Sequence, residues 1–306
     1  MIFPDNLDED YLCSLVHDVD IIIGWKPTKR LVLSAKKLSI LINPGAGAQH
    51  LIELFREINQ TRSVILVNGH GNAYFTAQHT IGILLALMNK IIPHHNWMNE
   101  GIWRQGDDQE ASIPLRNRNI GLLGYGAVNR YVHKFLSPFD NKFHVLKREW
   151  GDHHGKTDFT KYSPTDLNEF LKTIDILIIA IPLTSMTRDL IGKDQLELLG
   201  RESFIVNVGR GPIVEEQSLY DALKNKHIAG AAIDVWYDYR PVPDGNDKKY
   251  PYHFPFHELD NIVMSPHRAA SPFDDLQRWD EVIENITRFA TGSGEIINQV
   301  DIDREY

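Results

Sequence analysis

The chain has 306 residues, which is long enough for two ordinary domains or one large one. Hydrophobic residues make up 42% of it, so it can bury a sizeable core, and its composition does not indicate intrinsic disorder. Its net charge of −9 disfavours a nucleic-acid partner, because phosphate contacts need clustered Lys and Arg. A single cysteine, Cys13, excludes an internal disulfide and a cysteine-rich metal site, and it fits a reducing compartment.

Membrane and export signals are not found in the sequence. No apolar run reaches the roughly 18 residues that are needed to span a membrane. The first residues lack the basic stretch that opens a secretory signal. We therefore expect a cytoplasmic protein with no membrane partner.

Short apolar runs that would form strands alternate along the chain with longer runs that would form helices. Some short runs, such as residues 176–179, are apolar at every position, which is typical of parallel strands buried on both faces. Helices are expected over residues 77–88 and 275–290. The alternation predicts βαβ units and an α/β fold with parallel sheets. The expected strands are residues 19–23, 39–42, 63–67, 120–123, 144–146, 176–179, 204–208, 230–233 and 262–264.

Two crossings between domains are predicted. After the helix that ends at residue 88, the chain is polar and irregular from Pro93 to Asn119, so we place the first crossing near residue 90. The second crossing is expected near Ser271 and Pro272, ahead of the last helix. One domain would therefore comprise residues 1–90 and 272–306, and the other would comprise residues 91–271.

A glycine turn between an expected strand and an expected helix predicts a phosphate-binding loop. Gly124 would permit a tight turn, and Gly126 would let a pyrophosphate approach the backbone at the helix N-terminus. Asn129 stands where a third glycine normally packs helix against strand, which implies a slightly wider crossing. The alternative interpretation is an ordinary glycine turn between a strand and a helix. The residues expected to bind a dinucleotide here are Gly124, Tyr125, Gly126, Ala127 and Val128.

The end of the next strand bears on the choice of cofactor. An acidic residue about 20 positions after the glycine turn binds the ribose of NAD, whereas a basic one accommodates the 2′-phosphate of NADP. Lys147 and Arg148 stand at this distance and favour NADP. Glu149, one residue further, leaves NAD open, and a solvated charged turn is the alternative to either.

Four further motifs follow the glycine loop, and together they resemble the D-isomer-specific 2-hydroxyacid dehydrogenase family. The resemblance is strong over residues 119–271 and looser over the rest of the chain. It implies a Rossmann-type cofactor domain inserted into a flavodoxin-like substrate domain, and a homodimer. The motifs are Ile181-Pro182-Leu183-Thr184 with Thr187-Arg188 behind it, Asn207-Val208-Gly209-Arg210-Gly211, Ala232-Ile233-Asp234-Val235, and Ser265-Pro266-His267.

The resemblance also implies a reaction, in which hydride passes between a nicotinamide cofactor and a small 2-oxo or 2-hydroxy acid. Arg210 would pair with the substrate's carboxylate and carbonyl, and His267 would move the proton. Backbone N–H groups of Ala46 and Gly47 would orient the carboxylate. Asp234 and the Val208 backbone would position the nicotinamide carboxamide. The other residues expected at the cofactor are Ile181, Pro182, Thr187, Gly209 and His267 itself.

The sequence departs from the family pattern beside the histidine. The family usually has a glutamate where Tyr239 stands, and Asp238 is the nearest carboxylate that could partner His267. Without such a partner, His267 would lose stabilisation of its protonated form. The alternative function is therefore a nucleotide-binding sensor or scaffold without turnover, although Arg210 and His267 together favour an enzyme.

No metal site is expected. The remaining histidines considered, His70, His79 and the pair His153-His154, have no acidic ligands at metal-like spacing. We interpret them as structural or solvated.

Overall fold

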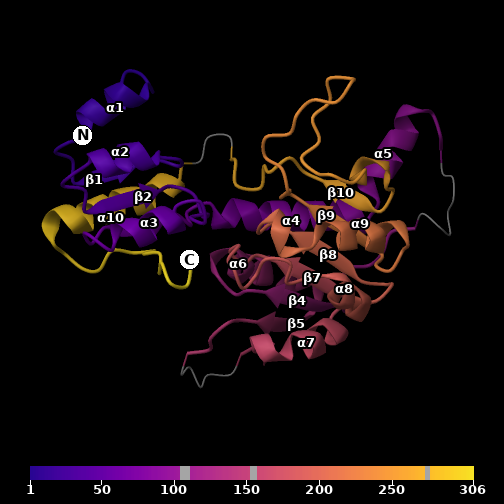
Figure 1. The fold of residues 1–306 in the computed structure, drawn as a ribbon. Helices are drawn as coiled ribbons and strands as arrows, with labels where there is room; N and C mark the ends of the chain where they lie inside the picture. Colours follow the sequence, from indigo (N-terminus) through magenta and orange to yellow (C-terminus); the bar gives the residue numbers. More distant parts are fainter. Residues whose placement is uncertain (104–110, 152–156, 273–275) are drawn as a thin grey trace. The chain divides into compact units, whose positions relative to one another are not determined.

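The protein divides into two compact units in a computed structural model (Figure 1). The first unit comprises Met1–Asn72 and Pro272–Tyr306, and the second comprises Ala73–Ser271. We expected the first crossing near residue 90, whereas the units divide ahead of helix α4 (Ala73–Met88), because α4 packs on α6 (Ala127–Leu136) of the second unit. The structure describes residues 1–103, 111–151, 157–272 and 276–306.

The first unit contains a parallel sheet in the order β1-β2-β3, with helices on both faces. Its elements are α1 (Glu9–Leu15), β1 (Ile21–Ile23), α2 (Lys29–Ser34), β2 (Ile40–Asn43), α3 (Ile52–Ile58), β3 (Ile65–Asn68) and α10 (Arg278–Thr291). Strand β2 is buried at every position, so its side chains alternate between two cores. Leu41 packs with Phe55 of α3, whereas Ile40 and Ile42 pack with Val282 of α10.

The second unit contains a seven-stranded parallel sheet in the order β10-β9-β8-β7-β4-β5-β6. The strand order reverses between β4 and β7, which is the arrangement of a doubly wound dinucleotide-binding fold. Its strands are β4 (Asn119–Leu123), β5 (Lys142–Leu146), β6 (Phe159–Tyr162), β7 (Ile176–Ile179), β8 (Phe204–Asn207), β9 (Gly230–Ile233) and β10 (Ile262–Met264). Its other helices are α5 (Ile91–Asn99), α7 (Leu167–Thr173), α8 (Lys193–Leu199) and α9 (Glu216–Lys224), with short 3-10 turns at Ser137–Phe139, Pro164–Asp166, Gly211–Ile213 and Phe256–Glu258.

Two hydrophobic cores cover the faces of this sheet. Leu177 and Ile179 of β7 pack in the core that holds Leu196 of α8, and Ile176 and Ile178 pack in the core that holds Val132 of α6. Both faces of β7 are therefore covered, which explains why every residue of this strand is apolar and buried. The α/β class with parallel sheets is confirmed.

The structure differs from the sequence-based expectation in three elements. Strand β6 was missed, because its residues are half-buried or exposed at the edge of the sheet and do not form an apolar run. Helix α5 lies where an irregular segment was expected, and Pro93 is tolerated because it falls in the first turn. Helix α10 begins at Arg278, and Asp275, where it was expected to begin, lies outside the described residues.

Among the helices of the described segments, no single one is long and apolar enough to cross a membrane. The pair α4 and α5 meets the limits of length and composition together, but the two helices are bent by 62°.

Candidate active site

The candidate site is built from loops that leave one edge of the seven-stranded sheet. Because all its strands are parallel, the loops after β4, β5, β7, β8, β9 and β10 start at the same carboxyl edge. These loops hold the glycine turn, the basic pair, Arg210, Asp234 and His267. Open α/β sheets bind their ligands at this edge, where the strand order reverses.

The glycine turn after β4 has the geometry that a dinucleotide phosphate requires. Gly124 has a φ of +85°, and a Cβ there would lie 2.5 Å from Ile181 Cγ2, so only glycine fits. Gly126 is the N-cap of α6, makes no side-chain cap, and faces open space where a Cβ would meet nothing. The helix end can therefore offer backbone N–H groups to an anion. These residues fit a bound dinucleotide.

Asn129 occupies the third glycine position and is fully buried. Its Nδ2 donates to the carbonyl oxygens of Leu123 at 3.2 Å and Gly124 at 2.8 Å. The side chain therefore ties α6 to the end of β4 and to the turn itself. Its Oδ1 is buried and has no hydrogen-bond partner among the described residues.

The basic pair after β5 belongs to a larger group of cations. Lys147 and Arg148 are exposed, as expected for a ligand-facing pair. The Nζ atoms of Lys147 and of Lys161 on β6 lie 5.8 and 5.1 Å from the centre of the Trp150 ring, within the range of cation–π contacts. Trp150 Nε1 donates to the Tyr162 carbonyl, which anchors the ring on β6. Lys161 was not singled out in the sequence, because β6 was not recognised.

Arg210 follows β8 in a loop that its two glycine neighbours make possible. A Cβ at Gly209 would lie 2.9 Å from the Ile181 carbonyl, and one at Gly211 would lie 2.3 Å from that of Trp236. The glycines are therefore required by close backbone approach. Asn207 Nδ2 donates to the Arg210 carbonyl, and Arg210 Nη1 donates to the Gly209 carbonyl at 2.7 Å. Burial lowers the pKa of Arg210, although a guanidinium stays charged near neutral pH.

His267 lies in the loop after β10 with a φ of 57°, an uncommon left-handed conformation for a residue other than glycine. The Tyr239 ring contacts it edge-on, with the ring centres 5.3 Å apart. Burial lowers the pKa of His267, the Arg210 guanidinium lowers it further, and Asp234 acts in the opposite direction.

Asp238 is not brought to His267. Its carboxylate accepts a hydrogen bond from the backbone N–H of Arg240 at 2.7 Å. Within the described ranges no hydrogen bond or ion pair joins it to the imidazole. The residue that contacts His267 is Tyr239, the one at the expected acid position, so the aromatic ring stands in the acid's place.

Asp234 is 1% exposed, and its carboxylate accepts several hydrogen bonds. Oδ1 accepts from Ser265 Oγ at 2.5 Å and from the Arg268 N–H at 2.8 Å, and Oδ2 accepts from the Ala269 N–H at 3.1 Å. Burial raises its pKa, but the hydrogen bonds from His79, Ser265 and the two backbone N–H groups together lower the pKa below its ordinary value. The carboxylate is therefore ionised and anchors the loop that bears His267.

The other predicted cofactor residues line the same edge. Val208 follows β8 directly, and its N–H donates to the Ile179 carbonyl at 3.2 Å. Ile181, Pro182 and Thr187 follow β7, and Thr187 Oγ1 donates to the Pro182 carbonyl at 2.7 Å, which closes this loop.

Ala46 and Gly47 belong to the first unit, in the loop after β2. Asn43 is buried, and its Nδ2 donates at 2.9 Å to the carbonyl oxygens of both Gly45 and Gly47. This fixes the loop, and the proposed task of Ala46 and Gly47 stays a prediction.

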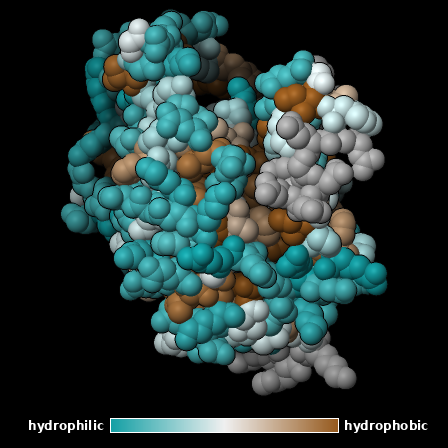
Figure 2. All heavy atoms as spheres, turned by 90° about the vertical axis from the view of Figure 1, so that its right-hand side faces the viewer, coloured by the Kyte–Doolittle hydropathy of each residue, from teal (hydrophilic) through white to brown (hydrophobic). Residues whose placement is uncertain are grey.

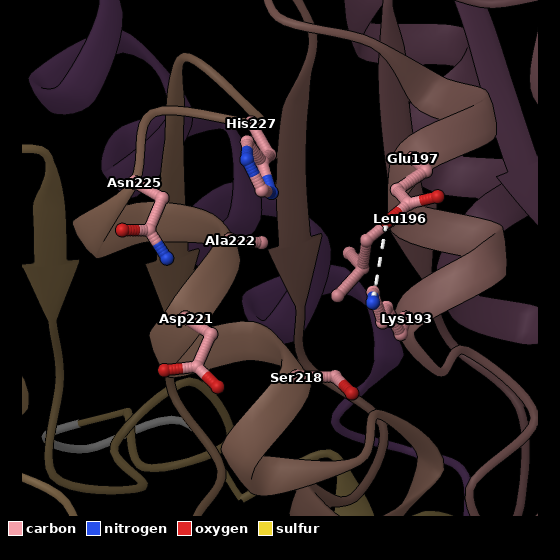
Figure 3. Close-up of a pocket in the computed structure, with 8 residues that line it drawn as sticks. All are labelled: Lys193, Leu196, Glu197, Ser218, Asp221, Ala222, Asn225 and His227. Carbon is pink, nitrogen blue, oxygen red and sulfur yellow. Dashed lines mark ion pairs between the residues drawn. The ribbon is translucent and has the colours of Figure 1, made fainter.

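A separate hollow of about 300 Å³ lies beside α8 and α9, and none of the residues expected at the site lines it (Figure 3). Lys193 and Glu197 form an ion pair across 3.9 Å on its α8 side. Its lining residues are Lys193, Leu196, Glu197, Ser218, Asp221, Ala222, Asn225 and His227.

In the described part of the chain, no three His, Cys, Asp or Glu side chains come together as a metal site. His153 and His154 lie outside the described residues. His79, interpreted from the sequence as structural or solvated, contacts Ser265 and Asp234. The signal of such a role in the sequence is that His79 is a polar residue within the mostly apolar run that forms α4.

Solved structures of known proteins share this architecture. A D-isomer specific 2-hydroxyacid dehydrogenase from Xanthobacter autotrophicus Py2, solved with NADPH and MES, has a TM-score of 0.77 and 25% identity, over 95% of this chain and 86% of that chain. An NADPH-dependent glyoxylate/hydroxypyruvate reductase from Sinorhizobium meliloti, solved with NADP and malonate, has a TM-score of 0.73 and 25% identity, over 95% of this chain and 88% of that one.

Curated proteins of the same kind are also similar to this chain in sequence. A D-3-phosphoglycerate dehydrogenase of Archaeoglobus fulgidus is 31% identical over 87% of this chain and 48% of its own length. A glyoxylate reductase of Thermofilum pendens is 32% identical over 67% of this chain and 58% of its own length. The chain thus spans about half the length of the curated relatives it matches. The model of the D-isomer specific 2-hydroxyacid dehydrogenase NAD-binding domain matches residues 81–269, and the chain belongs to this family.

Proposed function

We propose that the protein is an NAD(P)-dependent oxidoreductase that interconverts a small 2-oxo acid and the corresponding D-2-hydroxy acid. The observation that carries this proposal is the presence of Arg210 and His267 at the same sheet edge as the uncapped start of α6. An anion-binding helix end, a fixed guanidinium and a titratable imidazole are the groups that such a reaction needs. The second unit would bind the dinucleotide, and the first would contribute Ala46 and Gly47 to substrate binding.

Arg210 and His267 would have separate roles in this reaction. When bound, the nicotinamide supplies or accepts the hydride. Arg210 would hold the substrate's carboxylate and carbonyl oxygen with its fork of N–H donors, and the negative charge that grows on that oxygen would strengthen this contact. His267 would give a proton to that oxygen during reduction and take it back during oxidation. Arg210 together with His267 favours turnover over a nucleotide-binding sensor.

The environment of His267 sets the expected pH dependence. Reduction needs the protonated imidazole, so its rate falls as the pH rises through the pKa of His267. Burial and Arg210 lower this pKa, so the fall begins at lower pH than for an ordinary histidine. Oxidation needs the neutral imidazole and is favoured over the range where reduction declines.

The activity can be tested by measuring NADPH and NADH oxidation with glyoxylate, hydroxypyruvate, pyruvate and phenylpyruvate. We expect turnover with at least one of these 2-oxo acids and its near loss in His267→Asn. Tight cofactor binding without turnover on any of them would contradict the enzyme and favour the sensor.

The cofactor is proposed to be NADP rather than NAD. Lys147 and Arg148 after β5, together with Lys161 on β6, supply a cationic group that suits a 2′-phosphate. Titration of the protein's fluorescence with NADPH and NADH would measure the preference. Tighter binding of NADPH that weakens with salt is expected, and equal or tighter binding of NADH would contradict it.

The protein is also proposed to form a cytoplasmic homodimer. Apolar side chains interrupt the mostly hydrophilic face in Figure 2, and α5 carries exposed Ile91, Ile92 and Met98. Exposed apolar side chains suit an interface between protein chains. Light scattering during size-exclusion chromatography would test this, since a monomer at all concentrations would contradict it.

A further inference from the structure

His79 on α4 meets the loops that follow β9 and β10. Its Nε2 lies 2.9 Å from Ser265 Oγ and 3.5 Å from Asp234 Oδ1. Ser265 is 8% exposed and Asp234 is 1% exposed, so both must find their hydrogen-bond partners within the protein. The reaction proposed above gives His79 no task.

Counting protons fixes the direction of these hydrogen bonds. The ionised carboxylate of Asp234 can only accept, and the Ser265 hydroxyl donates its single proton to Oδ1. Ser265 Oγ can then only accept from His79, so the Nε2 of His79 must carry a hydrogen. His79, Ser265 and Asp234 thus form a directed chain of hydrogen bonds that ends on the buried charge.

This chain of hydrogen bonds clamps the backbone on both sides of His267. Ser265 lies two residues before it, and its N–H also donates to the Ile233 carbonyl at 2.8 Å. Arg268 and Ala269 follow it directly, and their N–H groups donate to Asp234. A left-handed conformation at His267 persists only if the surrounding structure stabilises it, and the hydrogen bonds of this network stabilise it.

We propose that His79 is a positioning residue for proton transfer by His267, acting through Ser265 and Asp234 on the backbone of residues 265–269. This inference rests on the proposed function in one respect, namely that His267 moves the proton. His79 touches neither reacting group. Its removal would misplace the imidazole and leave the phosphate loop unchanged.

The first test compares His79→Leu, His79→Gln and a control, His227→Leu. Gln can place an N–H donor near the position of Nε2, whereas Leu cannot. His227 is a half-buried histidine ahead of β9, at the opposite edge of the sheet, so its loss matches the loss of an imidazole without touching the site. We expect kcat to fall about 100-fold in His79→Leu, with KM for the 2-oxo acid and Kd for NADPH nearly unchanged.

The outcome for His79→Gln decides whether His79 positions His267 through its hydrogen bonds or only packs against its neighbours. Recovery of most of the kcat is expected from this variant, and an unchanged kcat is expected from His227→Leu. The proposal is overturned if His79→Leu loses thermal stability but keeps its kcat, if His79→Gln is as slow as His79→Leu, or if the loss falls on Kd for NADPH.

A second readout does not depend on turnover. Hydrogen–deuterium exchange at the amides of Arg268 and Ala269 should be several-fold faster in His79→Leu than in the parent and in His79→Gln. If the parent turns over no 2-oxo acid, the proposed function fails while this comparison still tests the network. If His79→Leu does not fold, Ser265→Ala takes its place, and unchanged exchange in that variant overturns the proposal.

Discussion

The two halves of the candidate site are held together in different ways. On the cofactor side, the turn after β4 depends on the backbone of a few consecutive residues, namely the left-handed Gly124 and the open N-terminus of α6 at Gly126. On the proton-transfer side, His267 depends on Tyr239 and on a network with His79 of α4, which lie far from it in the sequence. Local geometry defines the first half, and long-range contacts define the second.

This difference predicts that changes on the two sides will separate binding from chemistry. A change to the turn should weaken cofactor binding first. A change near His267 should slow the reaction while the cofactor still binds. Four experiments test this separation, in order of decreasing expected effect.

The largest effect is expected for His267→Asn. Loss of the proton-transfer group should lower kcat by on the order of 10³, because general acid–base catalysis by one side chain contributes about 10² to 10⁴. Steady-state NADPH oxidation gives kcat, and fluorescence titration gives Kd for NADPH, which should stay within a few-fold of the parent. A parallel loss of cofactor binding would mean that the two halves are not separable.

A matched pair of glycine variants tests the cofactor side. Gly124→Ala should lose both thermal stability and NADPH binding, because its φ is positive and its Cβ would clash with Ile181. Gly126→Ala should keep its melting temperature, because its Cβ meets no protein atom, yet weaken NADPH binding by about tenfold by crowding the phosphate. Equal binding by the parent and Gly126→Ala would contradict the assignment of this turn to the phosphate.

Tyr239→Glu tests what holds His267. A carboxylate beside the imidazole favours its protonated form, so the pKa of His267 should rise. The decline of the reduction rate should then move to higher pH. Tyr239→Phe keeps the ring contact and should keep the profile of the parent. Identical pH profiles in the parent and Tyr239→Glu would show that this position does not face the imidazole in solution.

The smallest effect is expected for Lys161→Ala. Loss of one exposed cation should weaken NADPH binding by about threefold and leave NADH binding unchanged, because exposed charge pairs contribute little. Fluorescence titrations at low and high salt would measure both. Lys172→Ala, which removes an exposed cation from α7, is the control. A loss of NADH affinity equal to that of NADPH would separate Lys161 from the 2′-phosphate.

The same contrast explains which features could be predicted from the sequence. Most strands of the two parallel sheets are short apolar runs, so all nine expected strands are present, and the half-exposed edge strand β6 was missed. The glycine turn was recognised because its requirements are local. The contact of Tyr239 with His267 and the bonds of His79 could not be predicted, because they depend on how β9, β10 and α4 pack.

Asp234 illustrates the limit of a motif most clearly. The motif predicts a role for it at the cofactor, and the structure adds that its carboxylate binds Ser265 and the backbone N–H groups after His267. A sequence motif identifies that an aspartate is needed at the end of β9. It does not say which donors the aspartate will meet, because these come from a different strand and a different helix.

The central claim is that His267 transfers the proton in a reduction that the cofactor side supports. Single-turnover oxidation of bound NADPH by glyoxylate, followed across pH in the parent and in His267→Asn, tests it most directly. We expect a rate in the parent that falls as pH rises through the lowered pKa of His267, and a nearly absent rate in the variant at equal NADPH occupancy. Equal rates in both proteins, or a parent rate that does not change with pH, would contradict it.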